Sequence, residues 1–338
     1  MAKRGASGLS RLVAVNKPCG MTSHDVVNRV RRICGERRVG HTGTLDPLAS
    51  GVLMVCVGPA TRLDAFMVGH GKRYRMGVLF GVGTDTDDDE GAVIKTRPVP
   101  DELFDRSFAE RTVASLVGPG TQVPPIYSAI KVDGRRAYDA ARAGSVIDLE
   151  PRPFEVYDAE LIDVVPQEEA GELRVEWVVE MSVSKGTYMR SIARDLGRDL
   201  KTAAHVSSLE RTRAGSISLD ECVTLEELEA DPAAGVIDPL RALGFRFAFV
   251  REGASRVENG SPLAAEELSL NEPLASEVFE PWCCTTSIYP SSEPPHEGEV
   301  VAVVVDRRVK ALYEYQESQH RYRARCVFSV GVERGTGL

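Results

Sequence analysis

The sequence predicts an α+β fold in two parts, and three features indicate it. The chain has 338 residues, the length of about two ordinary domains. Up to about residue 240, apolar strand patterns are interspersed with segments of helical period. From residue 244 short strands dominate, which is typical of a small β domain. We therefore expect a first domain over residues 1–240, with its core at about 10–215, and a β domain over residues 244–335.

The first elements follow from local signals. Residues 11–15 are largely apolar and predict a strand. A helix should follow, with Ser23 as its N-cap and Gly35 at its C-terminal stop, because Val26 and Val30 recur on one face. Further strands are expected at residues 52–57 and 74–80, with a helix at about 61–68 between them.

The later elements are predicted in the same way. The acidic residues 85–91 should form a solvated loop. Alternation over residues 173–183 predicts a strand that ends in a turn at 184–188, before a helix. Thr224 begins a capping box for a short helix, and Asp238 with Pro239 marks a boundary. The remaining strands are expected at 300–305, 311–315 and 321–332, and an insertion lies near 282–295.

Composition excludes several classes of protein. Hydrophobic residues make up 43% of the chain and charged residues 27%, as in ordinary globular proteins. The longest apolar runs have six residues, whereas a membrane helix needs about 20, and no signal-peptide core follows the N-terminus. We expect a cytoplasmic protein. The seven cysteines and six histidines show no metal-ligand spacing, so we expect free thiols and no metal site.

The net charge of −9 hides a strong asymmetry. Residues 1–75 carry 13 Lys and Arg against 4 Asp and Glu, a net charge of +9, so the remainder carries −18. A basic N-terminal part is typical of nucleic-acid contact, although basic residues can also simply cover a solvated face.

Residues 40–53 form the segment with the densest chemical signal. Three glycines allow close approach by a ligand, and Asp46 is the one carboxylate among them. The local pattern Asp46-Pro47 predicts a helix N-cap, with Pro47 at the first helical position. A capping Asp46 could still face a cleft.

Three other segments have weaker signals. Residues 72–75 place Tyr74 among cations, which suits base stacking, although a tyrosine at a strand start is commonly a packing residue. Residues 184–190 join Tyr188 and Arg190 at a strand-to-helix connection. Residues 124–131 predict a proline-stiffened supporting loop.

Six segments, taken in order, resemble the TruB family of bacterial tRNA pseudouridine synthases. They are residues 16–23, 40–53, 72–75, 124–131, 184–190 and 204–209. The resemblance covers about residues 10–240 and implies a catalytic domain with a mixed, largely antiparallel central sheet. Residues 257–263 and 303–315 resemble, more loosely, the small β-barrel PUA domain that accompanies such enzymes and binds RNA.

The resemblance implies an isomerase that converts the uridine at position 55 of the tRNA T-loop to pseudouridine. Asp46 would be the catalytic carboxylate, acting on a flipped-out uridine, with Arg190 beside it. Substrate contacts are expected from Tyr74, which would stack on the uracil, and from a further group: His41, Tyr188, Leu209 and Lys17. Lys17 would support the loop of Asp46, unless it is a surface lysine.

The implied reaction requires no cofactor and no metal, because it involves no net redox change and consumes no water. The partner would be the T-loop and T-stem of tRNA. We expect no membrane contact, no obligatory protein partner, and a monomer.

Alternative functions remain open from the sequence. A catalytically silent RNA-folding or RNP-assembly protein on the same scaffold would need the binding surface but not Asp46. A nucleoside or glycosidic hydrolase would need a second nearby carboxylate or a metal-binding Asp cluster, and neither is evident. The sequence also leaves open whether Asp46 forms a covalent adduct with the sugar or removes a C2′ proton to give a glycal.

Overall fold

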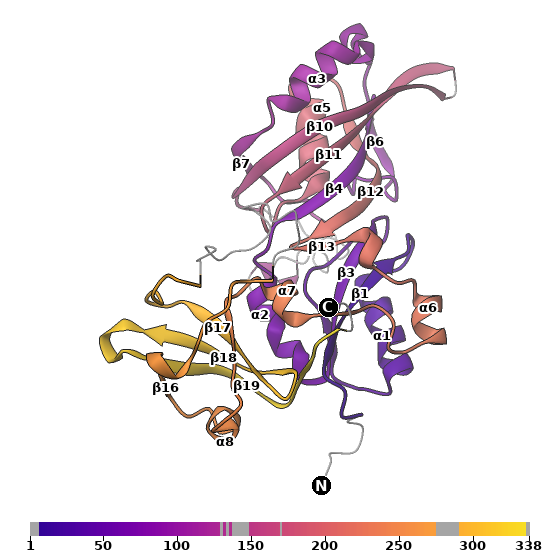
Figure 1. The fold of residues 1–338 in the computed structure, drawn as a ribbon. Helices are drawn as coiled ribbons and strands as arrows, with labels where there is room; N and C mark the ends of the chain where they lie inside the picture. Colours follow the sequence, from indigo (N-terminus) through magenta and orange to yellow (C-terminus); the bar gives the residue numbers. More distant parts are fainter. Residues whose placement is uncertain are drawn as a thin grey trace. The chain divides into compact units, whose positions relative to one another are not determined.

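A computed structural model describes residues 7–128, 131–132, 135–136, 149–169, 171–274 and 291–335 of the chain (Figure 1). The chain divides into two compact units. Unit 1 combines residues 1–71 with residues 213–338, and unit 2 comprises residues 72–212. The expected domains over 1–240 and 244–335 stay predictions. Most of the expected insertion near 282–295 lies outside the described residues, as do Cys283 and Cys284.

The N-terminal strands of unit 1 form a sheet in which β1 (Arg11–Lys17) is a central strand. This strand pairs antiparallel with β3 (Ser50–Val57) on one side and with β14 (Val236–Ile237) on the other, and β2 (Val39–His41) adds to β3. Alternate residues of β1 point to opposite faces, so Leu12 and Ala14 enter one apolar core while Val13 and Val15 enter another. The expected strands at 11–15 and 52–57 are confirmed.

Helix α1 (Ser23–Cys34) covers the second of these cores with Val26, Val27 and Val30. Its end at Gly35, which adopts φ +58°, is as predicted. The predicted N-cap is wrong by one residue. Thr22 caps the helix in a capping box with Asp25, because the hydroxyl of Ser23 is bonded elsewhere.

The expected helix at 61–68 is split into two shorter pieces. A 3₁₀ helix, η1 (Gly58–Leu63), leads into one turn of α-helix, α2 (Asp64–Met67). Thr224 caps α6 (Leu225–Ala230) in the predicted capping box. Short elements complete this part of unit 1: β13 (Ile217–Ser218), η3 (Leu219–Glu221), α7 (Pro239–Leu243), α8 (Ala254–Glu258) and η4 (Ala265–Glu267).

The C-terminal part of unit 1 is a five-stranded sheet, which confirms the predicted β character. Its order is β15 (Phe247–Phe249), β17 (Val300–Val305), β18 (Arg308–Gln316), β19 (Arg321–Glu333) and β16 (Leu263–Ala264). The pair β15 and β17 is parallel and the other pairs are antiparallel. The 3₁₀ turn η5 (Glu317–Gln319) joins β18 to β19.

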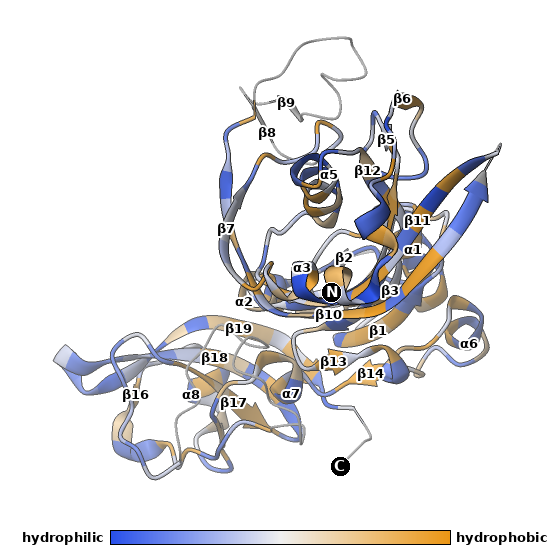
Figure 2. Cartoon of the chain, turned by 90° about the horizontal axis from the view of Figure 1, so that it is seen from above, coloured by the Kyte–Doolittle hydropathy of each residue, from blue (hydrophilic) through white to orange (hydrophobic). Residues whose placement is uncertain are grey.

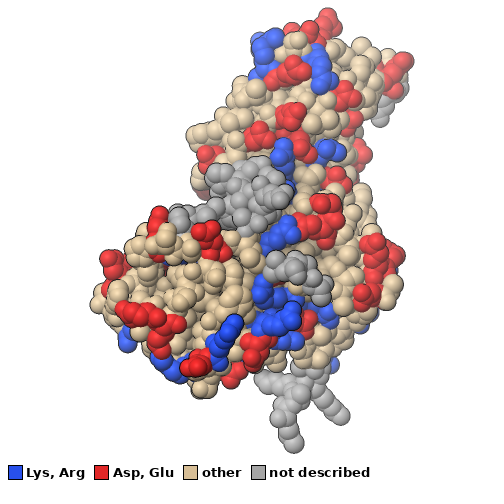
Figure 3. All heavy atoms as spheres, in the orientation of Figure 1, with Lys and Arg blue, Asp and Glu red and all other residues tan. Residues whose placement is uncertain are grey.

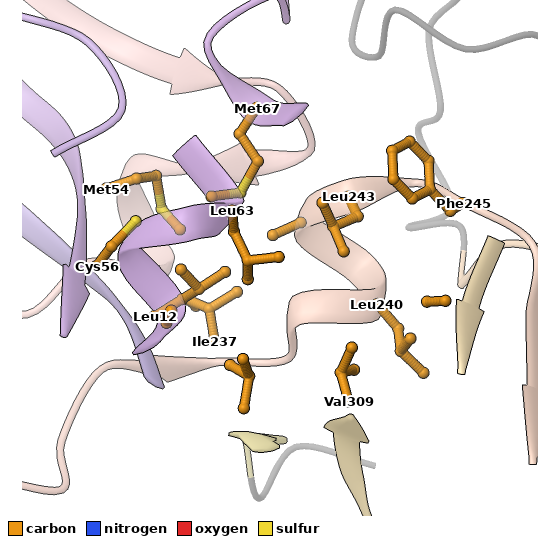
Figure 4. Close-up of a cluster of buried hydrophobic side chains, with 14 of the residues drawn as sticks. Leu12, Met54, Cys56, Leu63, Met67, Ile237, Leu240, Leu243, Phe245 and Val309 are labelled. Carbon is orange, nitrogen blue, oxygen red and sulfur yellow. The ribbon is translucent and has the colours of Figure 1, made fainter. Parts of the chain in front are cut away.

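One apolar core joins the two ends of the chain within unit 1 (Figure 4). Leu12 and Met54 from the first strands, Leu240 from α7, and Val309 and Leu312 from β18 belong to the same cluster. Asp238 caps α7, with Pro239 at its first position. The sequence marked a boundary here, and the structure shows a helix packed into this core.

Unit 2 is an antiparallel sheet with helices. Its strands follow the order β12 (Ala204–Ala214), β4 (Lys72–Phe80), β11 (Glu172–Val183), β10 (Arg152–Glu169) and β7 (Gly118–Gln122). Trp177 is fully buried in it, and its indole N–H donates to the carbonyl of Leu103 (2.8 Å). The α+β fold is confirmed.

The helices and hairpins of unit 2 complete its description. They are β5 (Val82–Thr84), β6 (Val93–Thr96), η2 (Asp101–Phe104), α3 (Arg106–Ala114), β8 (Lys131–Val132), β9 (Arg135–Arg136) and α5 (Met189–Asp199). Figure 2 shows both hydrophilic and hydrophobic residues along α5, whose buried side includes Ile192 and Leu196. Among the described residues, none of the helices has the length and apolar character needed to cross a bilayer.

Candidate functional site

Asp46 lies in the loop between β2 and β3, in unit 1, and its side chain is partly buried. The prediction that it caps a helix is wrong. The chain bends at Pro47 and Leu48 and enters β3 at Ser50, because the apolar run that follows is a buried strand. One turn-like bond remains, from the amide of Ala49 to the carbonyl of Asp46 (3.1 Å).

Lys17 supports this loop through a hydrogen bond to its backbone. Its side chain is fully buried, and its Nζ donates to the carbonyls of Met21 (2.6 Å), Pro18 (2.9 Å) and Pro47 (3.4 Å). The amide of Gly20 also donates to Pro47 (2.8 Å). Lys17 is therefore no surface lysine, and its ammonium group ties the turn after β1 to the residue that follows Asp46.

Ser23 fixes the other side of the same loop, a role that the sequence analysis missed. Its hydroxyl donates to the carbonyl of Leu45 (3.0 Å) and accepts from the amide of Leu45 (2.8 Å). Because both backbone groups of Leu45 bind one side chain, the residue before Asp46 is held at the start of α1. The Thr-Ser pair at the helix start was the available signal, since one hydroxyl suffices for a cap.

His41 ends β2, and its side chain is partly buried. Its Nδ1 accepts a hydrogen bond from the amide of Gly43 (3.3 Å), which places the ring proton of a neutral imidazole on Nε2. The three predicted site residues of unit 1, Lys17, His41 and Asp46, thus lie on segments that are locally braced.

In unit 2, Tyr74 lies on β4 and is 8% exposed. Its hydroxyl lies 3.5 Å from Nη1 of Arg211, on β12. Leu209, on the same strand as Arg211, is also nearly buried. The side chain of Tyr74 is thus well packed, with a cation at its polar end.

Arg190 is buried in the first turn of α5. Its guanidinium donates to the carbonyls of Thr86 (2.9 Å) and Tyr127 (3.0 Å) and forms an ion pair with Asp88 (3.3 Å), whose side chain is also buried. Tyr127 belongs to the segment expected as a supporting loop, of which residues 129–130 lie outside the described residues. The expected pairing of Arg190 with Asp46 stays a prediction.

The prediction of a solvated loop at 85–91 is wrong for its two central carboxylates. Asp88 is 3% exposed, and Asp87 pairs with Arg194 of α5 (3.0 Å). Burial raises the pKa of Asp87, and the charge of Arg194 counteracts this rise. Arg190 and Arg194 are four residues apart and so lie on one face of the helix, where their like charges repel each other. This spacing was the signal that could have indicated acidic partners for both.

Tyr188 is the N-cap residue of α5 and is partly buried. Its backbone amide donates to Oε1 of Gln122 at the end of β7 (3.3 Å). Across the described ranges, no cluster of three or more histidine, cysteine, aspartate or glutamate side chains is arranged to hold a metal ion. The described cysteines are free thiols: Cys19, Cys34, Cys56, Cys222 and Cys326.

Comparison with known proteins gives consistent matches. Residues 31–189 match the N-terminal domain of the TruB family of pseudouridylate synthases, and residues 190–240 match the tRNA pseudouridylate synthase B C-terminal domain. The tRNA pseudouridine synthase B of Geobacillus kaustophilus is 39% identical over 285 residues, which cover 81% of this chain and 99% of that protein. The Bacillus subtilis enzyme is 38% identical over 263 residues, which cover 76% and 84%.

Solved structures share the fold at lower sequence identity. An H/ACA RNP bound to a substrate RNA containing 2′-deoxyuridine contains a chain that aligns with a TM-score of 0.64 and 20% identity, over 95% of this chain and 85% of its own length. A Cbf5-Nop10-Gar1 complex gives a TM-score of 0.62 with 22% identity, over 95% and 85%.

Proposed function

Because the chain belongs to the TruB family of tRNA pseudouridine synthases, we propose that it isomerises the uridine at position 55 of the T-loop, with Asp46 as the catalytic carboxylate. The chain is thus an isomerase acting on tRNA. In the reaction the N1 to C1′ bond breaks, the uracil turns, and a C5 to C1′ bond forms. The proton on C5 is lost and N1 gains one, so the product is an isomer.

The observation that carries the assignment of Asp46 is the bracing of its loop. Lys17 binds the carbonyl of Pro47 on one side, and Ser23 binds both backbone groups of Leu45 on the other. A carboxylate that must meet one sugar carbon benefits from this fixed position, since misplacement by 1 Å can cost about 100-fold in rate. Either a covalent adduct at C1′ or removal of the C2′ proton is compatible with one carboxylate.

The other residues are assigned roles around the extruded uridine. Tyr74 would stack on the uracil, which offsets part of the few kcal/mol that base extrusion costs. His41 would hold the loop open, Tyr188 would line the pocket beside the base, and Leu209 would form its apolar wall. Arg190, fixed by Asp88, would favour the ionised form of Asp46 through its positive charge.

The proposed partner is the T-loop and T-stem of tRNA, bound by a monomer without an obligatory protein partner. The basic excess of residues 1–75 supports this, because Lys and Arg neutralise phosphates on binding.

The test is Asp46→Asn, which is nearly isosteric and removes the ionised carboxylate. We expect isomerisation to be lost while folding and tRNA affinity stay close to those of the parent. Unmodified tRNA would be incubated with each protein, and pseudouridine at position 55 would be detected by selective chemical labelling and sequencing. Turnover near the parent rate would contradict the catalytic role of Asp46. A parent protein that binds tRNA but forms no pseudouridine would instead favour the silent RNA-folding function.

A further inference from the structure

Unit 1 contains a cavity of about 490 Å³ that none of the assigned roles uses. It lies between the segment that includes α2 and the strands β18 and β19. Its volume is within the range of about 300–1,000 Å³ that is typical of small-molecule sites. Its lining residues are Arg62, Ala65, Phe66, Glu314, Gln316, Arg323, Ala324, Arg325 and Cys326.

The cavity begins where an apolar seam ends. Leu312 of β18 and Cys326 and Phe328 of β19 belong to the buried core of unit 1. Two and four residues further along β18, the same face of the strand carries Glu314 and Gln316. The alternation of the strand would place apolar side chains at these two positions, as part of the core. The side chains present are polar, and they line the cavity.

The charge of the lining is positive. Three arginines stand against one glutamate, which gives a net charge of +2. Arg325 pairs with Glu314 (3.3 Å), and Arg62 donates to the carbonyl of Val327 (2.7 Å). Arg323 is exposed, and within the described part of the chain its guanidinium has no hydrogen bond or ion pair. Figure 3 shows Lys and Arg side chains interspersed with Asp and Glu over the visible face of the molecule.

Two further lining groups suit a nucleotide. Phe66 is partly buried and packs edge-on against Phe245, which fixes its ring at the cavity wall. The Oε1 atom of Gln316 is buried, and no donor in the described ranges reaches it. A ribose hydroxyl or a base N–H that entered the cavity would supply that donor after a rotation of the amide.

We propose that this cavity binds one nucleotide of an RNA strand. Its phosphate would bind Arg323 and Arg62, and its base would lie against the ring of Phe66. The inference rests on the proposed function, because it names a second contact for the same RNA substrate. Arginine forks match phosphate geometry, and phosphate contacts position an RNA without reading its sequence. The cavity would therefore contribute affinity and orientation rather than chemistry.

The test compares Arg323→Glu, on β19, with the matched reversal Arg307→Glu. Arg307 is an exposed arginine in the turn before β18, at the end of that strand opposite to the lining residues Glu314 and Gln316. We expect Arg323→Glu to weaken tRNA binding severalfold and to reduce the slope of log K against log salt by about 0.7 to 0.9. The KM for tRNA should rise while kcat stays unchanged, and Arg307→Glu should change none of these. Arg323→Gln, which removes the charge without reversing it, should give the same reduction in slope.

A second experiment distinguishes a phosphate of tRNA from a free phosphate or nucleotide. Thermal unfolding would be followed with inorganic phosphate and with uridine monophosphate. Stabilisation of the parent by these probes, lost in Arg323→Glu without any change in tRNA affinity, would overturn the proposal in favour of a free nucleotide. An unchanged affinity and salt slope in Arg323→Glu would also overturn it. Failure of the proposed function would look different, because the parent itself would bind tRNA and form no pseudouridine.

Discussion

Lys17 carries a positive charge at a fully buried position, where it binds the backbone carbonyls of Met21, after β1, and of Pro47, next to Asp46. An ammonium group in this setting is stabilised by its acceptors, and these carbonyls in turn depend on it. The residue thus couples the position of the Asp46 loop to the stability of unit 1.

We predict that Lys17→Met lowers the free energy of unfolding by about 1–3 kcal/mol, because three partly buried hydrogen bonds to backbone carbonyls are lost. It should also lower kcat while changing tRNA affinity little, since the loop of Asp46 loses its support. Chemical denaturation and single-turnover isomerisation would measure the two effects. Lys95→Met, at an exposed position on β6, is the matched control and should leave both values unchanged. Full activity of Lys17→Met would contradict the supporting role.

Tyr74 offers a second prediction at this scale. Base stacking on an aromatic side chain contributes about 1–3 kcal/mol, so Tyr74→Leu should slow single-turnover isomerisation by roughly 5- to 150-fold. Tyr74→Phe keeps the ring and removes the hydroxyl near Arg211, and it should retain most of the rate. If Tyr74→Leu reduces the affinity for tRNA without slowing the reaction, the residue contributes to docking and not to the reacting base.

At the scale of elements, the loop of residues 85–91 is clamped to α5 by Asp87 and Asp88. Removing one partner of a buried ion pair leaves an uncompensated charge, so Asp88→Ala should destabilise the protein by about 3–5 kcal/mol. Glu160→Gln, at an exposed position on β10, should change stability by less than about 0.5 kcal/mol. Urea denaturation of both variants would check this. Equal, small effects would show that Arg190 is held by its carbonyl partners alone.

The elements that the sequence predicted are those with strong local signals. Helix α1 and strand β11 follow from apolar periodicity, and α6 follows from its capping box. The order of strands could not be obtained from such signals, because pairing depends on contacts between residues far apart in the chain. The family resemblance, and not periodicity, indicated the mixed sheet.

The errors have one physical cause in common. Asp46-Pro47 has the local pattern of a helix start, but the buried strand β3 determines the path of the chain. The carboxylates at 87 and 88 have the composition of a solvated loop, but their arginine partners lie on a helix about a hundred residues later. In both cases tertiary contacts override a correct local preference.

At the scale of the whole molecule, the basic excess near the N-terminus is partly used within the fold. Arg29 pairs with Glu226 and Glu229, and Arg31 donates to the carbonyl of Val39. Arg32 and Arg37 are exposed. Of these four arginines, Arg32 and Arg37 remain as cations that can meet a phosphate.

We therefore predict that reversing Arg32 and Arg37 to Glu flattens the salt dependence of tRNA binding. The slope of log K against log salt is about −0.7 for each phosphate neutralised on a single strand. Reversal of Arg251 and Arg307, two exposed arginines in the C-terminal part, is the matched control and should change the slope less. Filter binding over a range of salt concentrations measures both. No flattening in the first variant would show that Arg32 and Arg37 are only solvated.

The shared core around α7 has a consequence for the order in which the protein folds during synthesis. Leu12 and Ala14 precede unit 2 in the chain, yet the buried cluster to which they belong also includes Leu312, Phe328 and Val332, which follow unit 2. Unit 1 is discontinuous, whereas unit 2 is a single run of residues 72–212. Unit 2 is therefore synthesised completely before unit 1, and β1 keeps an uncovered apolar face until β18 and β19 have been synthesised.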